Sequence, residues 1–295
     1  MQSLIIGGSG KIGKSLNYKH SKKTFYKNKI KNGIRFNLIN DDINLLIEKY
    51  KINRVILLSA ISDPDVCFKK KNYSNKLNVD KTKKLINILI KKKIYFIFFS
   101  SEYVFDGKIG NYKENSKIKP NNLYGTQKFI IENYIKRKTK NFSILRIGKT
   151  YGDNIKDKTL ISNFLNELIN GKSFFKVAND QIFNPLFIGD LKKIVDIFLK
   201  KKIKGVFNVG GPQKLSRYKV LELILKTLGK NIMKKIKLEK ISLNDIATLD
   251  RRPLNVSMDI KKLKTKIKFK MKTISNVAFN MIIKNNVKSK IFKRR

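Results

Sequence analysis

The chain has 295 residues, with 67 Lys plus Arg against 21 Asp plus Glu and a formal net charge of +46. Its composition, 41% hydrophobic and 10% aromatic, excludes a disordered polycation, and no run approaches the roughly 18 apolar residues that a membrane span needs. A single cysteine, Cys67, excludes an internal disulfide, and the N-terminus enters a strand-like segment without a signal peptide, so we expect a cytoplasmic protein.

The first half of the chain alternates short apolar runs with amphipathic segments. Strands are expected at 3–6, 24–26, 54–59, 94–100 and 142–147, and helices from about residue 11 and at 41–50, 77–90 and 123–136. Strands without polar alternation that are separated by helices indicate a parallel sheet covered on both faces. We therefore predict an α/β fold with a Rossmann-type, doubly wound parallel sheet.

The second half is less regular. Helices are expected near 161–170, 190–201 and 217–228, with a short strand at 206–209. The chain has no internal repeat and no Gly/Ser-rich or Pro-rich linker that would separate two independent domains. We therefore expect two interleaved lobes, with the sheet in residues 1–150, a returning segment near 180–200, and a smaller C-terminal α/β lobe in 151–295.

A glycine-rich turn joins the first expected strand to the first expected helix. Its sequence places glycines at 7, 10 and 13. A dinucleotide pyrophosphate needs close backbone approach, free N–H groups and a helix N-terminus, and this turn provides all three. We predict that this turn binds the cofactor through Gly7, Gly10, Lys11, Ile12 and Gly13.

The end of the second strand bears on the choice of nicotinamide cofactor. A carboxylate there would bind the ribose 2′-hydroxyl of NADH, but the stretch contains Lys27 and Lys29 instead. Because lysines suit a 2′-phosphate, NADPH is the expected cofactor and NADH is the alternative.

Three residues form a candidate carbonyl-reduction site. Tyr124 and Lys128 are four apart, so they share one helix face, and the ammonium is expected to lower the pKa of the phenol. Ser101 follows an apolar strand, at the sheet edge where such folds bind ligands. In such a site Ser hydrogen-bonds the substrate oxygen, Tyr protonates it, and Lys tunes Tyr and holds the ribose.

The chain resembles the extended short-chain dehydrogenase/reductases, and among them the dTDP-4-dehydrorhamnose reductase family. The matching segments, in chain order, are Ser100–Gly107 (SSEYVFDG), Tyr112, Glu114, Pro120, Asn122, Tyr124–Lys128 (YGTQK), Glu132, Leu145-Arg146, Tyr151-Gly152, Asp180-Gln181, Pro185, Asp190, Phe207–Gly211, Ser216–Tyr218 and Arg252–Asn255. The resemblance covers nearly the whole chain. It implies NAD(P)H-dependent reduction of the C4 ketone of a nucleotide-linked 6-deoxysugar, in dTDP-rhamnose and cell-surface polysaccharide biosynthesis, with Ser101, Tyr124 and Lys128 as catalytic residues.

The same resemblance assigns further positions. The additional cofactor-binding residues are Asn37, Leu38, Ser59, Ala60 and Ile61, where Asn37 replaces an acidic residue of the family and the run from Ser59 replaces its N-A-A-A. The implied substrate-binding residues are Ser62, Glu102, Tyr103 and Arg252, whose guanidinium also suits a pyrophosphate. Asn78, on a helix behind the site, is implied to support Lys128 through water.

Departures from the family pattern leave alternatives open. Related dehydratases carry T-D-E where this chain has Ser101-Glu102-Tyr103, and one acid fewer disfavours elimination. A nucleotide-sugar epimerase remains an alternative because it uses the same Ser, Tyr and Lys, and so does a regulatory NADP-binding subunit like that of methionine adenosyltransferase. Some members form a dimer bridged by a metal that a Glu binds, and this chain has Ser15 near the place of that Glu. We therefore predict no metal site. We expect a monomer or a homodimer.

The excess positive charge does not by itself predict a nucleic-acid partner. Nine of the 67 basic residues are Arg and the remaining 58 are Lys, whereas nucleic-acid recognition usually recruits Arg. The lysines are spread along the chain, and no DNA- or RNA-binding module accompanies them. We interpret them as compositional drift on permissive surface, with a secondary role in attracting a sugar nucleotide by long-range steering.

Overall fold

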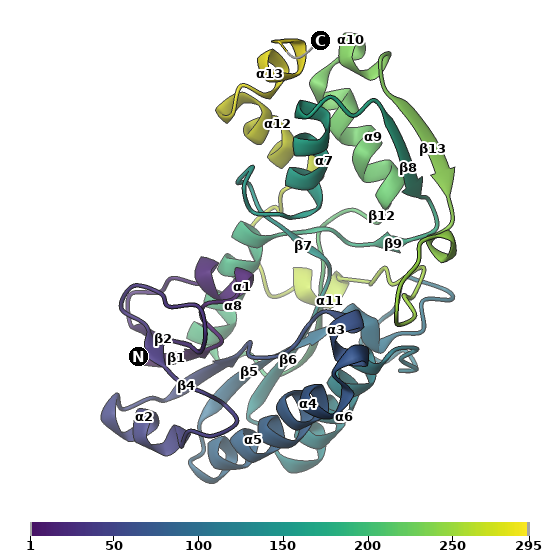
Figure 1. The fold of residues 1–295 in the computed structure, drawn as a ribbon. Helices are drawn as coiled ribbons and strands as arrows, with labels where there is room; N and C mark the ends of the chain where they lie inside the picture. The colour runs from purple at the N-terminus through teal and green to yellow at the C-terminus, as the bar shows by residue number, and fades with distance from the viewer. Residues whose placement is uncertain (1, 294–295) are drawn as a thin grey trace.

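Short apolar runs build the central sheet of the computed structural model, which describes residues 2–293 (Figure 1). All seven strands are parallel, in the order β11-β6-β5-β4-β1-β2-β3. Their bounds are β1 Ser3–Ile6, β2 Ser21–Phe25, β3 Ile34–Arg35, β4 Arg54–Leu57, β5 Tyr95–Ser101, β6 Phe142–Ile147 and β11 Gly205–Val209. This order confirms the predicted Rossmann-type α/β fold.

Helices cover both faces of the sheet, which explains why its strands lack polar alternation. Alternate residues of one strand enter different cores: Leu4 and Ile6 of β1 pack on one face and Ile5 on the other. The first face is covered by α2 (Ile43–Lys49), α5 (Thr82–Lys91) and α6 (Leu123–Lys138). The second is covered by α1 (Lys11–Ser15), α8 (Ile188–Lys201) and α11 (Lys261–Lys264).

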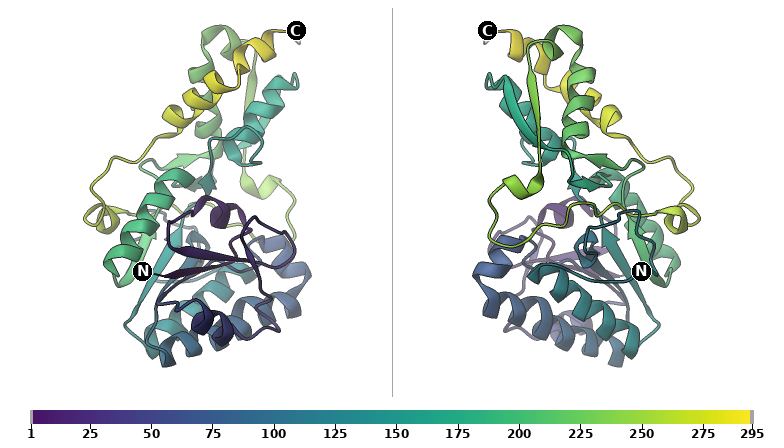
Figure 2. Two further views of the ribbon diagram at one scale, coloured as in Figure 1. Left: turned by 90° about the vertical axis from the view of Figure 1, so that its left-hand side faces the viewer. Right: turned by 90° about the vertical axis from the view of Figure 1, so that its right-hand side faces the viewer.

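A second, smaller lobe has its own apolar core and stacks on the sheet lobe (Figure 2). It contains α7 (Leu160–Ile169), α9 (Arg217–Leu228), α10 (Lys230–Met233), α12 (Ile274–Lys284), α13 (Val287–Lys293) and the parallel pair β8 (Phe174–Ala178) and β13 (Lys237–Ile241). Two short pairs lie between the lobes: β7 (Thr150–Tyr151) with β10 (Leu186–Phe187), and β9 (Ile182–Phe183) with β12 (Leu215–Ser216). The chain returns to the sheet through α8 and β11 before entering α9.

One helical stretch differs from the sequence prediction. Where the sequence predicts one helix at 77–90, the chain forms a π-helical segment at Lys76–Lys81 and then α5. Two further short helices, α3 (Pro64–Lys69) and α4 (Lys71–Asn75), precede it. The π-helical segment contains Asn78, whose side chain bonds both the N–H and the C=O of Ile61, each at 2.9 Å. This distant contact is invisible to helical periodicity, because it is made to a loop 17 residues earlier in the chain.

A buried ion pair fastens α6 to the sheet. Arg146 on β6 and Glu132 on α6 are almost fully buried, and Nη2 lies 2.8 Å from Oε2. The same carboxylate accepts the Ser100 hydroxyl of β5 at 2.6 Å, and Nη1 of Arg146 donates to the carbonyl of Glu114 at 3.0 Å. Since every member has a partner, this network fixes α6 relative to β5 and β6.

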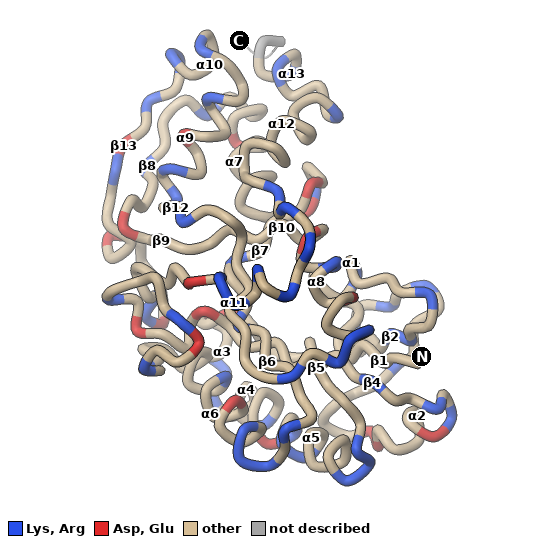
Figure 3. Tube along the Cα trace, turned by 180° about the vertical axis from the view of Figure 1, so that it is seen from behind, with Lys and Arg blue, Asp and Glu red and all other residues tan. Residues whose placement is uncertain are grey.

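The positive charge is distributed over the whole molecule. Figure 3 shows Lys and Arg on both lobes and on loops at opposite ends of the chain trace. Several lysine runs terminate helices, as at the ends of α5 and α8, where cations suit the helix dipole. None of the helices in residues 2–293 combines the length and the apolar character needed to cross a bilayer.

Replacing Arg146 with Met should lower the free energy of unfolding by about 3–5 kcal/mol, because it leaves the Glu132 carboxylate buried without its cation. Urea unfolding followed by circular dichroism measures this loss. The double variant Arg146→Met, Glu132→Leu should recover part of it, since neither charge then remains buried.

The control is Lys200→Ala, which removes an exposed pair with Asp196 on α8 and should change stability by no more than about 0.5 kcal/mol. A loss in Arg146→Met no larger than in this control would contradict the role given to the buried pair.

Candidate functional site

A cavity of about 730 Å³ opens at the carboxyl edge of the sheet, where β1 lies between β2 and β4 and the winding direction reverses. Most of the sequence-predicted site residues line it: Gly7, Gly10, Lys11, Ile12, Gly13, Ala60, Ser62, Ser101, Glu102, Tyr103, Tyr124, Lys128 and Arg252. These come from the glycine turn, the loop after β4, the end of β5, the start of α6 and the second lobe. Their roles remain predictions, but the fold brings them to one place.

Four predicted cofactor residues lie outside the lining of this cavity. Leu38 packs against the apolar core beneath α2, and the backbone N–H of Asn37 bonds the Asp41 carboxylate at 2.7 Å. Ser59 lies directly against Gly7, and both backbone groups of Ile61 are held by Asn78. Ser59 and Ile61 therefore support the wall of the cavity from behind.

The glycine turn requires its glycines for close backbone packing. Gly7 has φ +91°, and a Cβ there would come within 2.7 Å of the Ser59 backbone nitrogen. A Cβ on Gly13 would lie 2.5 Å from the Gly7 carbonyl oxygen. Within the described residues no side chain caps the start of α1. The turn therefore offers backbone to a ligand where any larger residue would fill the space.

Ser101, Tyr124 and Lys128 are all buried at one wall of the cavity. Ser101 ends β5, whereas Tyr124 and Lys128 lie on successive turns at the start of α6. The Lys128 ammonium donates to the Phe99 carbonyl at 2.9 Å and lies 5.6 Å from the centre of the Tyr124 ring. Asn122 caps this helix by accepting the Gly125 N–H at 2.8 Å, which sets the helix start that carries the phenol.

Burial dominates the protonation of these side chains. It raises the pKa of Tyr124 above its ordinary value, and a hydrogen bond from Ser101 opposes the shift. It also lowers the pKa of Lys128 to about 8. The expected lowering of the Tyr124 pKa by Lys128 is therefore wrong for this structure. Desolvation of the phenol and the neighbouring Cys67, Tyr103 and Glu102 all raise this pKa, and the Lys128 ammonium is bound to the Phe99 carbonyl.

A buried amide network lies behind α6. Asn78 donates to the Gln127 side chain at 2.7 Å, and Gln127 donates to Ser74 and Asn75 at 2.9 and 2.8 Å. Asn78 therefore supports the site through Gln127, the neighbour of Lys128, and through the loop at Ile61.

Two cations of the cavity were not predicted from the sequence. Lys149 lies just after β6 and Arg217 begins α9, and both line the cavity together with Lys11 and Arg252. Burial and the neighbouring cations lower the pKa of Lys149 to about 8. Nε of Arg217 and Nη1 of Arg252 are buried without a hydrogen-bond partner in the described part of the chain. These unpaired N–H donors fit an anionic ligand with several oxygens.

The sequence carried an unused signal for one of these two cations. Arg217 is one of only nine arginines, and it lies in a segment that matches the family. Lys149 could not be singled out, because it is one of 58 lysines.

Glu102 is the only acid among the residues that the sequence assigned to this cavity, and it is 4% exposed. Its Oε2 has no hydrogen-bond partner among residues 2–293. Burial raises the pKa of this carboxyl to about 8, although the charge and the backbone N–H of Lys149 oppose the shift. Tyr103 follows it and packs edge-on against Tyr124, with ring centres 6.3 Å apart.

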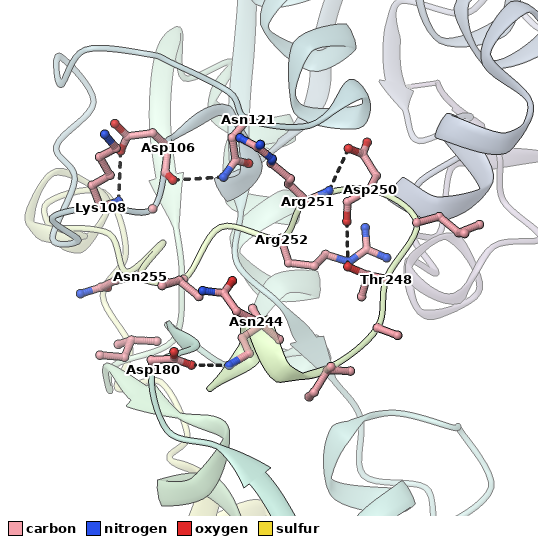
Figure 4. A pocket seen from close by; sticks show the side chains of 17 residues that line it. Asp106, Lys108, Asn121, Asp180, Asn244, Thr248, Asp250, Arg251, Arg252 and Asn255 are labelled. Atoms are coloured by element: carbon pink, nitrogen blue, oxygen red, sulfur yellow. Dashed lines mark hydrogen bonds between the residues drawn. The ribbon is translucent and has the colours of Figure 1, made fainter. Parts of the chain in front are cut away.

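A segment at residues 243–252, the strap, passes from the second lobe across the mouth of the cavity. Leu243, Ile246, Thr248 and Arg252 of the strap line the cavity. The strap also lines a second cavity of about 890 Å³ on its other side. Figure 4 shows its polar residues along one wall of that second cavity. The strap therefore lies between the two cavities.

Carboxylates bind the strap to the sheet lobe. Asp65 accepts the backbone N–H groups of Leu249 and Asp250 at 3.1 and 3.0 Å, and it pairs with Arg252 at 2.8 Å. Asp250 in turn accepts the N–H of Leu123, the residue before Tyr124, at 2.9 Å. The position of the strap and the start of α6 are therefore linked.

No group of three or more His, Cys, Asp and Glu that could hold a metal ion occurs within residues 2–293. His20 is exposed at the end of the loop before β2 and lies outside the main cavity.

The chain was compared with known families and proteins. It matches the family model described as RmlD substrate binding domain over residues 1–285. It is 25% identical over 272 residues to dTDP-4-dehydrorhamnose reductase of Aggregatibacter actinomycetemcomitans, which covers 88% of this chain and 91% of the relative. It is also 25% identical over 234 residues to methionine adenosyltransferase 2 subunit beta of Xenopus laevis, covering 74% and 70%.

Solved structures share the fold. A dTDP-4-dehydrorhamnose reductase from Bacillus anthracis, in complex with NADP, has a TM-score of 0.80 at 17% identity and covers 96% of this chain and 100% of its own. A hypothetical dTDP-4-dehydrorhamnose reductase from Sulfolobus tokodaii has a TM-score of 0.78 at 22% identity, covering 93% and 98%.

Asp65→Ala should loosen the strap, because it removes the acceptor of two backbone N–H groups and the partner of Arg252. We expect the amides of Leu249 and Asp250 to exchange with deuterium at least about tenfold faster, as for loss of hydrogen bonds to a charged group. Hydrogen exchange of strap peptides, read by mass spectrometry, measures this. Asp153→Ala removes an exposed acid elsewhere and should leave strap exchange unchanged; equal exchange in both variants would refute the fastening role.

Glu102 should make stability pH-dependent. Its pKa is raised from 4.5 to about 8, so between these values the folded state binds more protons than the unfolded state, and stability falls as pH rises. Glu102→Gln removes this dependence. Urea unfolding at about pH 5.5 and 8 should show that the wild type loses more stability than the variant over this interval; parallel losses would show that the carboxyl ionises normally.

Proposed function

The chain belongs to the family described as RmlD substrate binding domain, and from this premise we propose that it is an NAD(P)H-dependent reductase of a nucleotide-linked 4-keto-6-deoxysugar. The family match bears out the resemblance to dTDP-4-dehydrorhamnose reductases that the sequence motifs indicated. The observation that carries the proposal is the convergence of Ser101, Tyr124 and Lys128 in one cavity with the glycine turn. We place the reaction in deoxysugar and cell-surface polysaccharide biosynthesis.

The residues around the glycine turn fit a nicotinamide dinucleotide. The tight packing of Gly7 and Gly13 and the uncapped start of α1 leave backbone N–H groups for a pyrophosphate. Lys27 and Lys29 are exposed just after β2, which favours NADPH over NADH. A bound reduced cofactor supplies the hydride that the protein itself lacks. A solved relative of the same fold holds NADP.

Tyr124 is the proton donor in this proposal. The ketone oxygen accepts hydrogen bonds from the hydroxyls of Ser101 and Tyr124, which polarise the carbonyl. As hydride reaches C4, the phenol gives its proton to the oxygen, and the alcohol forms. The raised pKa of Tyr124 keeps the phenol protonated for this step. Lys128, at the same wall of the cavity, would hold the ribose of the cofactor.

The cations of the cavity define the substrate class. The cavity that contains Ser101, Tyr124 and Lys128 is also lined by Lys149, Arg217 and Arg252. Each of the two arginines has a buried N–H group without a hydrogen-bond partner in the described chain. Two phosphate groups of a nucleotide sugar supply the oxygens that these donors need. Residues 1–150, with the returning segment, would then bind the cofactor, and residues 151–295 with the strap would bind the sugar nucleotide.

Two other functions remain as candidates. A nucleotide-sugar epimerase would use the same Ser101, Tyr124 and Lys128, since oxidation and re-reduction at C4 need the same groups. Similarity to methionine adenosyltransferase 2 subunit beta favours a non-catalytic, NADP-binding subunit. The three intact catalytic side chains support an enzyme.

The wild-type protein should oxidise NADPH only when a dTDP-4-keto-6-deoxysugar is present, followed by absorbance at 340 nm. Tyr124→Phe should lower kcat by about 10²–10⁴-fold, because it removes the proton donor. Tyr134→Phe is the matched control: Tyr134 lies on the same helix, faces Asn87 and is absent from the cavity lining. NADPH oxidation that does not depend on the sugar, or none at all, would reject the reductase.

A further inference from the structure

The proposed reduction of a ketone gives no proton-transfer role to one buried acid of the cavity. Glu102 directly follows Ser101 at the end of β5. Its strand pairs with β6 in the register Ser101 to Ile147, which sets Glu102 beside Gly148 and Lys149. A Cβ added to Gly148 would lie 3.4 Å from Glu102 Oε2, so the carboxyl packs closely against that backbone.

A second buried glutamate shows what a structural carboxylate looks like in this protein. Glu132 accepts hydrogen bonds from Ser100 and from two nitrogens of Arg146. Glu102 is also buried, at the wall of the cavity, yet its Oε2 has no partner in the described chain. An unpaired buried polar atom costs about 1–3 kcal/mol, so Oε2 of Glu102 lowers stability unless a ligand binds it.

The surroundings of Glu102 suit proton transfer. Lys149 acts on the carboxyl through both its ammonium and its backbone N–H, and Arg217 and Arg252 line the same cavity. Glu102 and Lys149 both have pKa values of about 8, so near neutral pH each can bind or release a proton. Ser101 and Tyr124, next to Glu102, hold a ketone oxygen in the proposed reaction.

From this arrangement we propose that Glu102, assisted by Lys149, is an acid–base residue that exchanges a proton on the carbon next to the ketone of the bound sugar. The proposal rests on the proposed function, because it uses the same ketosugar in the same cavity. It gives the site a second activity that needs no hydride. Proton return to the opposite face of the carbon would invert that centre.

The step balances without an oxidant or reductant. The Glu102 carboxylate takes the proton from the carbon beside the carbonyl, and the electrons of the broken C–H bond form a C=C bond. The π electrons of the carbonyl move to its oxygen, giving an enolate that Ser101 and Tyr124 stabilise by hydrogen bonding. Glu102 then exchanges its proton with solvent, and a solvent-derived proton returns to the carbon.

The test incubates the full-length protein with dTDP-4-keto-6-deoxyglucose in D₂O without reduced nicotinamide. Mass spectrometry and proton NMR then follow deuterium entry next to the ketone. We expect exchange at least about tenfold above a protein-free sample. Glu102→Gln keeps the hydrogen-bonding capacity of the side chain but cannot transfer a proton, so exchange should fall by about 10²-fold or to the protein-free rate.

Two further measurements separate proton transfer from binding or folding. Glu102→Gln should lower the exchange rate at least about tenfold more than it lowers kcat/KM in the NADPH assay, whereas a residue that only bound the sugar would lower both to the same extent. Lys149→Met provides a second variant should the first fail to fold, and its exchange should fall at least about tenfold. Circular dichroism checks that each variant is folded.

Wild-type exchange at the protein-free rate, or exchange unaffected in both variants, would overturn the proposal. Deuterium exchange without NADPH oxidation would support the acid–base role of Glu102 and reject the reductase. NADPH oxidation without deuterium exchange would support the reductase and overturn the acid–base role.

Discussion

The buried pair of Arg146 and Glu132 is the constraint on which the site depends. It joins β6 to α6 with almost no exposure to water, and through Ser100 it also holds β5. Ser101 is next to Ser100, and Tyr124 and Lys128 lie on α6. A shift of the helix against the sheet would therefore break charge-assisted hydrogen bonds in a region of low dielectric, which restricts the relative movement of Ser101, Tyr124 and Lys128.

The cavity next to these side chains contains buried polar atoms that have no hydrogen-bond partner among residues 2–293. Among residues 2–293, Glu102, Arg217 and Arg252 each have a buried polar atom without a hydrogen-bond partner, and all three line the same cavity. Such a group of unpaired atoms in one cavity fits a polar ligand. The strap completes the arrangement, because Asp65 of α3 binds Arg252 of the strap and Asp250 of the strap binds the start of α6. The position of Arg252 in the cavity and the start of α6 are therefore linked through one short segment.

The net charge of +46 contributes less to this picture than its size suggests. Lysines cover both lobes, whereas the contacts that shape the site use scarce residues: Arg146, Glu132, Asp65 and Arg252 (Figure 3). In a chain so rich in Lys, an acid or an arginine carries more information about function than a lysine does. Lys149 is the exception, and its importance comes only from where the fold places it.

The sequence by itself determined the fold class and most of the cavity. Uninterrupted apolar strands require a sheet covered on both faces, a glycine turn at the first strand requires close backbone approach, and a four-residue spacing puts Tyr124 and Lys128 on one helix face. These are local rules. The tertiary structure alone decided that Lys149 and Arg217 join the site, that Ile61, Ser59, Asn37 and Leu38 do not line it, and that burial raises the pKa of Tyr124. Each of these outcomes depends on desolvation or on contacts between residues far apart in the chain, which no local pattern encodes.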